Sequence, residues 1–371
     1  MDTKKDYTGK EIYMGIDVHK KTYCCISLCE EEIVKRDTLP ASPKGLLAYM
    51  NKFFPGANIN SAYEAGFSGF HLHRYLSSNG INNKVVHPAS IEISSRDRVK
   101  TDKRDAKKIA VQLASGRLQG ILVPSEEREA RRSVSRLRTH FWQHRTRIGM
   151  QLKSLLFTQG LIEENDNTRL CQKWITQKLS EIDEKEYPSD FCYTVKQYAQ
   201  EWTDLTKKMK EIEGQLKTQA ESEKSIHSIY ESVPGIGLIH ARELANELGD
   251  MSQFRNEKKL FSFTGLTPTQ HSSGDNIRLG HISRQGSSVL RKILIEASWV
   301  AITKDPSLEE IYKRLSPRGS KRAIVGIARR LVGRIRSCLL NGTLYEIQSV
   351  KNIITQDKDP RDLVRSPVCL H

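Results

Sequence analysis

Between Ile12 and Leu39 the chain carries three short runs with strand-like patterns before any helical pattern begins, and this order restricts the possible folds. The runs are IYMGIDV, TYCCISL and EEIVKRDTL, and the polar triplet HKK between the first two favours a turn. Such runs predict an antiparallel meander of three strands. Ser42 then predicts the N-terminal cap of a helix that continues to about Phe53.

Strands and helices alternate in the next segment. INSAYEA predicts a strand, SGFHLHRYLSSNG a helix closed by its glycine, NKVVHP a further strand, and a helix begins near Thr101. Three strands followed by helix, strand, helix, strand and helix is the order of an RNase H/RuvC-like α/β domain, a mixed sheet flanked by helices. We place this domain at residues 10–125. A length of 371 residues leaves room for further domains.

Residues 126–225 have a helical pattern. Apolar residues spaced alternately by three and four predict a coiled-coil seam. An upstream helix with its own apolar stripe makes an antiparallel hairpin or a dimerising arm the expected arrangement. Its many arginines are either a solvated face or a nucleic-acid contact. The seam is Val195, Tyr198, Trp202, Leu205, Met209, Ile212 and Leu216, and the upstream stripe is Leu137, Phe141, Ile148, Leu152 and Leu155.

Residues 226–345 predict a mainly helical C-terminal domain, and residues 346–371 a polar tail. In SVPGIGLIHARELANELG, Gly235 and Gly237 form a turn between two helices. A helix-hairpin-helix could hold a DNA phosphate there with backbone N–H groups, although any tight turn between helices uses such glycines. The last helix is basic and includes Arg329 and Arg330. The expected fold class is therefore α/β plus α.

The composition favours a polyanionic partner. The formal net charge is +15 and the pI is about 9.4. Nucleic acid is the commonest polyanion, but ribosome-associated and membrane-surface proteins have similar charge. Seven cysteines without CxxC pairing argue against a zinc ribbon or a disulfide framework. No signal peptide or membrane span is recognisable, so we expect a cytoplasmic protein with no membrane partner.

Four carboxylates could converge in the first domain. Asp17 lies in the first strand and Glu64 ends the fourth, which lies beside it in an RNase H-like sheet. Asp102 and Asp105 are three apart on a helix and share a face. Converging carboxylates need counter-charge, and Mg²⁺ ions supply it. Alternatively, Asp102 caps its helix and Asp105 pairs with a lysine.

Seven motifs occur in an order that resembles the DEDD transposases of the insertion-sequence family one-hundred-and-ten, which include bridge-RNA-guided recombinases. They are GIDVHKKT, YEAGFSG, KTDKRDA, SVPGIG, FTGLTP, SSG and GHISRQGSSVLRK, and they cover residues 13–340. The resemblance implies that the acidic tetrad is Asp17, Glu64, Asp102 and Asp105. It also implies a catalytic serine in the Ser-Gly pair eight residues after Gly265, which is Ser273, with Ser272 adjacent to it.

The resemblance further implies a transposase that cuts and rejoins DNA by serine attack on a phosphodiester. It would use two Mg²⁺ ions, for which Mn²⁺ could substitute. The implied partners are double-stranded DNA at element ends and target, and a structured noncoding guide RNA. A homo-oligomer, dimer or tetramer, would act beside the prokaryotic nucleoid. The residues expected to contact nucleic acid are Lys100, Lys103, Arg104, Arg131, Arg138, Gly235, Gly237, Arg278, Arg284, Arg329 and Arg330.

Two other functions fit the same residues. In a hydrolytic nuclease similar to a Holliday junction resolvase, the tetrad would activate water and Ser273 would be structural. In a non-catalytic DNA-binding protein, the helix-hairpin-helix and the arm would account for all activity. Cleavage that survives Ser273→Ala distinguishes the first, and metal-independent binding without cleavage distinguishes the second.

Overall fold

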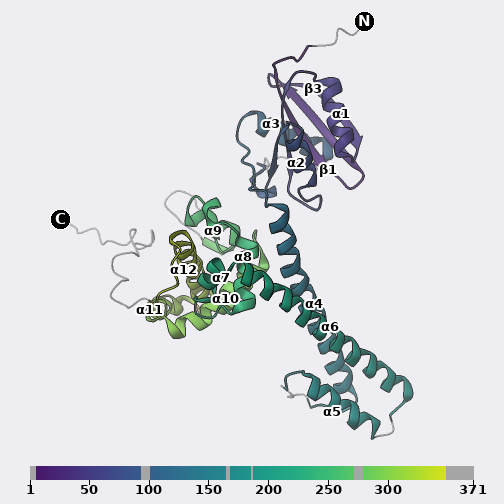
Figure 1. Ribbon diagram of the computed structural model, residues 1–371, viewed down its shortest axis with the longest axis vertical. Coiled ribbons are helices and arrows are strands. Elements are labelled where there is room, and N and C mark those ends of the chain that lie inside the picture. Colours follow the sequence, from purple (N-terminus) through teal and green to yellow (C-terminus); the bar gives the residue numbers. More distant parts are fainter. Residues whose placement is uncertain (1–5, 93–100, 164–167, 185–186, 271–278, 348–371) are drawn as a thin grey trace, which may run out of the picture. The chain divides into compact units, whose positions relative to one another are not determined.

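The computed structural model describes residues 6–92, 101–163, 168–184, 187–270 and 279–347 (Figure 1). The chain divides into two compact units, Met1–Pro124 and Ser125–His371. No helix in the described ranges is long and apolar enough to cross a lipid bilayer.

The first unit is a mixed five-stranded sheet with helices. An antiparallel meander consists of β1 (Glu11–Val18), β2 (Thr22–Cys29) and β3 (Glu32–Pro40). Two parallel strands, β4 (Asn58–Glu64) and β5 (Asn82–Val86), extend it in the order β3-β2-β1-β4-β5. The helices are α1 (Pro43–Phe53), α2 (His71–Ser78) and α3 (Asp102–Ala114), with a 3₁₀ turn η1 (Pro88–Ser90). The predicted mixed sheet and order of elements are confirmed.

Alternation along β1 gives the sheet two packed faces. Ile12, Met14 and Ile16 are fully buried in the core that includes α1 and α2. The opposite face packs on α3, whose Ala106 and Ala110 belong to a second core cluster. Because α3 crosses β1 closely, a Cβ on Gly15 would overlap the Ala106 carbonyl oxygen and lie 2.5 Å from the Ala110 nitrogen. Only glycine permits this approach.

The second unit is helical, with one small hairpin. Its long helices are α4 (Glu126–Thr158) and α6 (Ser189–Ser222), with α5 (Gln172–Asp183) between them in sequence. The remaining elements are α7 (Lys224–Glu231), α8 (Leu238–Leu248), η2 (Met251–Gln253), α9 (Glu257–Thr264), β6 (Pro268–Gln270), β7 (Leu279–Ile282), α10 (Ser288–Lys304), α11 (Pro306–Leu315), η3 (Ser316–Arg318) and α12 (Ser320–Asn341).

Helices α4 and α6 lie side by side and antiparallel (Figure 1). Arg131 pairs with Glu223, whereas Arg138, which lies further along α4, pairs with Glu213, which comes earlier in the chain than Glu223. The two helices therefore run in opposite directions. Most of the predicted seam on α6 is buried, as are Ile148 and Leu152 on α4. Leu137 was expected in the stripe but is 43% exposed, while its neighbour Arg138 forms the ion pair with Glu213 of α6.

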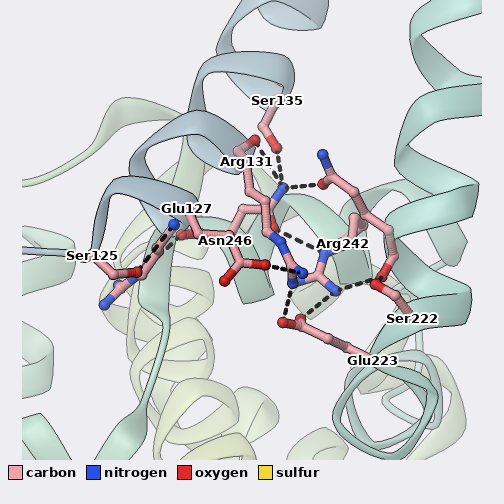
Figure 2. A network of polar contacts seen from close by, with 10 residues as sticks. Ser125, Glu127, Arg131, Ser135, Ser222, Glu223, Arg242 and Asn246 are labelled. Carbon is pink, nitrogen blue, oxygen red and sulfur yellow. Dashed lines mark hydrogen bonds and ion pairs between the residues drawn. The ribbon is translucent and has the colours of Figure 1, made fainter.

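A buried polar network joins α4, α6 and α8 (Figure 2). Arg242 of α8 is almost fully buried and contacts Glu223 at 2.7 Å, and Glu223 also pairs with Arg131. Asn246 donates to the Ser135 hydroxyl at 2.8 Å and to the Gln219 side chain at 3.0 Å. The Asn246 amide and the Arg242 guanidinium have these hydrogen-bond and ion-pair partners only when the three helices lie together.

A second buried cluster closes the end of the unit. Asp305 is fully buried and caps α11 through the N–H groups of Ser307 and Leu308. Its other oxygen accepts hydrogen bonds from Arg334 at 2.9 Å and from the Tyr345 hydroxyl at 2.6 Å. Burial raises the pKa of this carboxyl, but these hydrogen bonds and the Arg334 charge outweigh burial and hold the pKa below its ordinary value.

Substitution of Gly15 tests the α3–β1 contact. Gly15→Ala should destabilise the first unit by about 3 kcal/mol, because the new methyl group meets the α3 backbone at both Ala106 and Ala110. Denaturant unfolding followed by circular dichroism measures the change. Gly66→Ala is the matched control, since nothing lies within 4 Å of its Cβ position. An equal, small effect of both variants would contradict the close approach.

Removal of Glu247 tests the charges on α8. Its side chain is 4% exposed and pairs with Arg132 at 3.0 Å and Arg136 at 2.9 Å. Glu247→Ala should cost about 3 kcal/mol of unfolding free energy, because two guanidinium groups lose their buried partner. Thermal and denaturant unfolding measure the loss. The exposed Glu221→Ala on α6 serves as the control and should stay near wild type.

Candidate metal centre and active site

Asp17 lies at the end of β1, on the sheet face that α3 covers. Its neighbour Ile16 points into the opposite core and is fully buried, so strand alternation turns Asp17 toward α3. In the antiparallel pairing with β2, Asp17 stands opposite Cys24. The Asp17 side chain is 22% exposed, which places a carboxylate near the surface but with little water around it.

Glu64 is the last residue of β4 and lies next to the strand position of Asp17. The parallel register pairs Ile16 with Tyr63, so Asp17 and Glu64 follow at the same level of the sheet. Tyr63 belongs to the core on the α1 and α2 side, whereas Ala62 packs with Ile109 of α3. Alternation therefore puts Glu64 on the α3 face with Asp17.

The first turn of α3 supplies Asp102 and Asp105. Carboxylates in a first helical turn are stabilised by the unpaired N–H groups and the helix dipole. The Asp102 side chain is 64% exposed, whereas Asp105 is half-buried and accepts a contact from Lys108 at 3.2 Å. The predicted alternative role of Asp105, pairing with a lysine, therefore occurs in this structure alongside its position at the cluster.

The structure adds His19, which the sequence pattern had assigned only to a turn. Its Nε2 atom lies 3.1 Å from Asp17 Oδ2 and 3.2 Å from Asp102 Oδ2. The His19 N–H still donates to the Thr22 carbonyl at 2.9 Å, so the strand pairing continues beyond β1. The sequence did contain a signal for His19. It follows Asp17 by two residues, and residues two apart on a continuing strand point to the same face of the sheet.

The electrostatics of Asp17 show how closely the acids lie. Burial raises the pKa of Asp17, and the charges of Asp102 and Asp105 raise it further, while His19 lowers it. Among the described residues, donor atoms of Asp17, His19 and Asp102 all lie within 4.8 Å of one another. Glu64 is outside that set of mutually close atoms. Two carboxylates and an imidazole nitrogen are a donor set that suits a divalent cation.

The predicted serine lies outside the described residues, as do Ser272, Arg278 and Lys100. In the sequence, Ser273 falls between β6 and β7, which pair antiparallel with Gln270 opposite Leu279. Gly265 and Gly286 meet beside this hairpin, where a Cβ on Gly265 would lie 2.7 Å from the Gly286 nitrogen. Two adjacent glycines thus bring the segments before β6 and after β7 into close contact.

Two of the expected nucleic-acid residues are used inside the chain. Arg131 pairs with Glu223 and with Glu127. Arg138 contacts Glu213 at 2.8 Å and the buried Glu243 at 3.1 Å. Apart from Glu127, four residues before Arg131, these partners are far away in sequence, so those ion pairs could not be recognised from local spacing. We leave both arginines out of the proposed interface.

The other expected contacts have mixed surroundings. Lys103, Arg104 and Arg284 are exposed, whereas Arg329 and Arg330 of α12 are half-buried, with Arg329 over the Phe261 ring. Gly237 has open space around it. Gly235 adopts φ +85° and its Cβ position would lie 2.8 Å from Val300 Cβ of α10, so packing and a left-handed turn explain that glycine.

Comparisons with known proteins point to one kind of enzyme. Residues 14–158 match a model of the DEDD domain of IS110 transposases, and residues 227–313 match one described as the IS116/IS110/IS902 transposase family. The chain is 27% identical to the transposase for insertion sequence element IS1533 of Leptospira borgpetersenii, over 78% of this chain and 85% of that one. It is 24% identical to the transposase for IS1111A of Coxiella burnetii, over 70% and 72%.

The raised pKa of Asp17 predicts a pH-dependent stability. The folded chain holds this proton more tightly than the unfolded chain, so stability falls as pH rises from the ordinary value of 3.8 through the raised value. At neutral pH without divalent cations, Asp17→Asn should therefore raise the melting temperature of the first unit by a few degrees. The gain should shrink as the pH falls toward about 4.

Differential scanning fluorimetry in a chelating buffer measures this difference. Glu30→Gln removes a carboxylate whose side chain is 76% exposed and should change little. A lower melting temperature for Asp17→Asn at neutral pH would show that the carboxylate stabilises the fold, contrary to this electrostatic account.

Proposed function

Because the chain belongs to the IS116/IS110/IS902 family of transposases, we propose that it moves DNA by cutting and rejoining strands with a serine and a carboxylate-bound metal centre. The convergence of Asp17, His19 and Asp102, with Asp105 close enough to shift the Asp17 pKa, carries this proposal. The acids come from β1 and from the start of α3, within the part of the chain that matches the DEDD model.

Divalent metal ions, when bound, would neutralise the converging carboxylates and polarise the phosphate of a DNA strand. We assign their binding to Asp17, Asp102 and Asp105, with Glu64 at the neighbouring strand position. Mg²⁺ suits carboxylate oxygens, and Mn²⁺ has similar requirements. Both acids of α3 are placed by the same helix turn, so loss of either should disturb the centre.

The proposed nucleophile is Ser273. A new bond forms between its Oγ and the phosphorus, the bond from phosphorus to one deoxyribose oxygen breaks, and the serine proton passes to the leaving hydroxyl. The resulting phosphoserine ester conserves the energy of the phosphodiester. A hydroxyl on a second strand can then attack the ester, release Ser273 and complete the exchange without ATP.

Basic side chains near the hairpin support a phosphate contact. Arg284 is exposed and adopts φ +56°, an uncommon conformation for a non-glycine residue. Besides burial, the charge of Arg284 lowers the pKa of Arg291, so the two guanidiniums lie near each other. Arg291 itself donates to the Gly286 carbonyl at 2.6 Å. We assign Arg284, and Arg278 on the same segment, to the developing charge of the phosphate.

A guide RNA and a homo-oligomer complete the proposal. The formal net charge of +15 is an excess of cations over acids in the sequence, and cations are what an RNA backbone binds. Exposed Lys103 and Arg104, beside the metal centre, are the first contacts that we assign to nucleic acid. Serine and acidic centre would come from different subunits, as the family resemblance implies.

The decisive experiment looks for a covalent protein–DNA adduct. Purified protein is incubated with Mg²⁺, element-end DNA and RNA transcribed beside the gene, then denatured and separated by electrophoresis. Wild type should give DNA that migrates with protein. Ser273→Ala and Asp102→Ala should each abolish the adduct, lowering its yield at least about 100-fold, whereas the control Ser272→Ala should retain it.

Free nicked DNA without an adduct, unchanged by Ser273→Ala, would contradict the serine mechanism. The chain would then act as a metal-dependent nuclease, the alternative that the compact acidic centre of the first unit also permits. Retained adduct in Ser273→Ala with loss in Ser272→Ala would reassign the nucleophile.

A further inference from the structure

His19 lies in the candidate metal centre beside Asp17 and Asp102, although it is not one of the four predicted acids. It follows β1, and its N–H donates to the Thr22 carbonyl, so the backbone at His19 is held by the β1–β2 hairpin. The imidazole is thus placed by the same strand pairing that places Asp17. Lys20 and Lys21, which follow it, are exposed in the turn.

One ring nitrogen faces two acids at once. His19 Nε2 is 3.1 Å from an oxygen of Asp17 and 3.2 Å from an oxygen of Asp102. Neighbouring ligand atoms around one six-coordinate ion are about 3 Å apart when each is about 2.1 Å from the ion. The Nε2 atom is therefore at ligand spacing from both carboxylates, and all three atoms belong to one group within 4.8 Å.

A nitrogen ligand changes which ions a site prefers. Mg²⁺ strongly favours oxygen ligands, whereas imidazole suits first-row transition ions, and Mn²⁺ accepts both oxygen and nitrogen. We infer that His19 is a metal ligand through Nε2 and that it makes this centre bind Mn²⁺ in preference to Mg²⁺. This inference rests on the proposed metal centre and specifies one of its ligands and its ion selectivity.

Calorimetric titration of the full chain, without nucleic acid, tests the inference. MnCl₂ and MgCl₂ are titrated separately at one pH into wild type, His19→Ala and His19→Gln. Mn²⁺ affinity should fall at least about tenfold in His19→Ala, whereas Mg²⁺ affinity should change less than about threefold. His19→Gln offers an amide oxygen instead of the nitrogen, so it should lose the Mn²⁺ preference but keep Mg²⁺ binding.

A spectroscopic readout is independent of affinity. Bound Mn²⁺ should show electron spin echo modulation from a directly bonded imidazole nitrogen in wild type, and none in either His19 variant. His71→Ala removes an exposed histidine at the start of α2 and should leave both the affinity and the modulation unchanged. Melting temperatures of all variants establish that each is folded.

The outcomes separate this inference from the proposed function. The metal centre would stand without a role for His19 if three results came together. Asp17→Asn would lose ion binding, His19→Ala would keep the wild-type Mn²⁺ affinity, and wild type would show no nitrogen modulation. Equal weakening of Mn²⁺ and Mg²⁺ in His19→Ala would also overturn the selectivity. Ion binding unaffected by Asp17→Asn and by His19→Ala would overturn the centre itself.

Discussion

The close packing of α3 on β1 at Gly15 is the contact on which the candidate centre depends. The helix can lie against the strand only because Gly15 has no side chain, and the start of that helix carries Asp102 and Asp105. Asp17, two residues after Gly15, faces the same helix. A larger distance between helix and strand would move the acids apart. They would then neither repel one another nor hold a cation together. One glycine therefore positions three catalytic candidates.

In the second unit, buried ion pairs add to the apolar cores where α8 meets α4 and α6. Arg242 and Glu243 are buried on α8, and their partners are Glu223, which follows α6, and Arg138 of α4. Burying a charge is unfavourable unless it is paired, so these helices have few alternative arrangements in which every charge is satisfied. A basic helix can thus be a structural element, and its charge alone does not identify a nucleic-acid surface.

Sequence patterns predicted what local spacing determines and missed what distant residues determine. Alternation and capping signals gave the order of strands and helices along the chain and the acids at the end of β1 and the start of α3. They also gave the Ser42 cap, whose hydroxyl accepts a hydrogen bond from the Gly45 N–H at 3.1 Å. His19 was missed because a turn was expected where hairpin pairing continues. Arg131 and Arg138 found acids far away in sequence, and Leu137 became exposed at that level. The serine mechanism and the guide RNA remain proposals.

The cluster of Asp305, Arg334 and Tyr345 has a practical consequence for handling the protein. Tyr345 lies beyond the end of α12, yet its hydroxyl contacts buried Asp305 and its N–H donates to the Ser232 hydroxyl at 2.9 Å. The folded unit therefore extends past the last helix. A protein shortened at the glycine that ends α12, or carrying an affinity tag there, would leave a buried carboxylate with fewer donors. Fusion partners belong after residue 347, where the cluster stays intact.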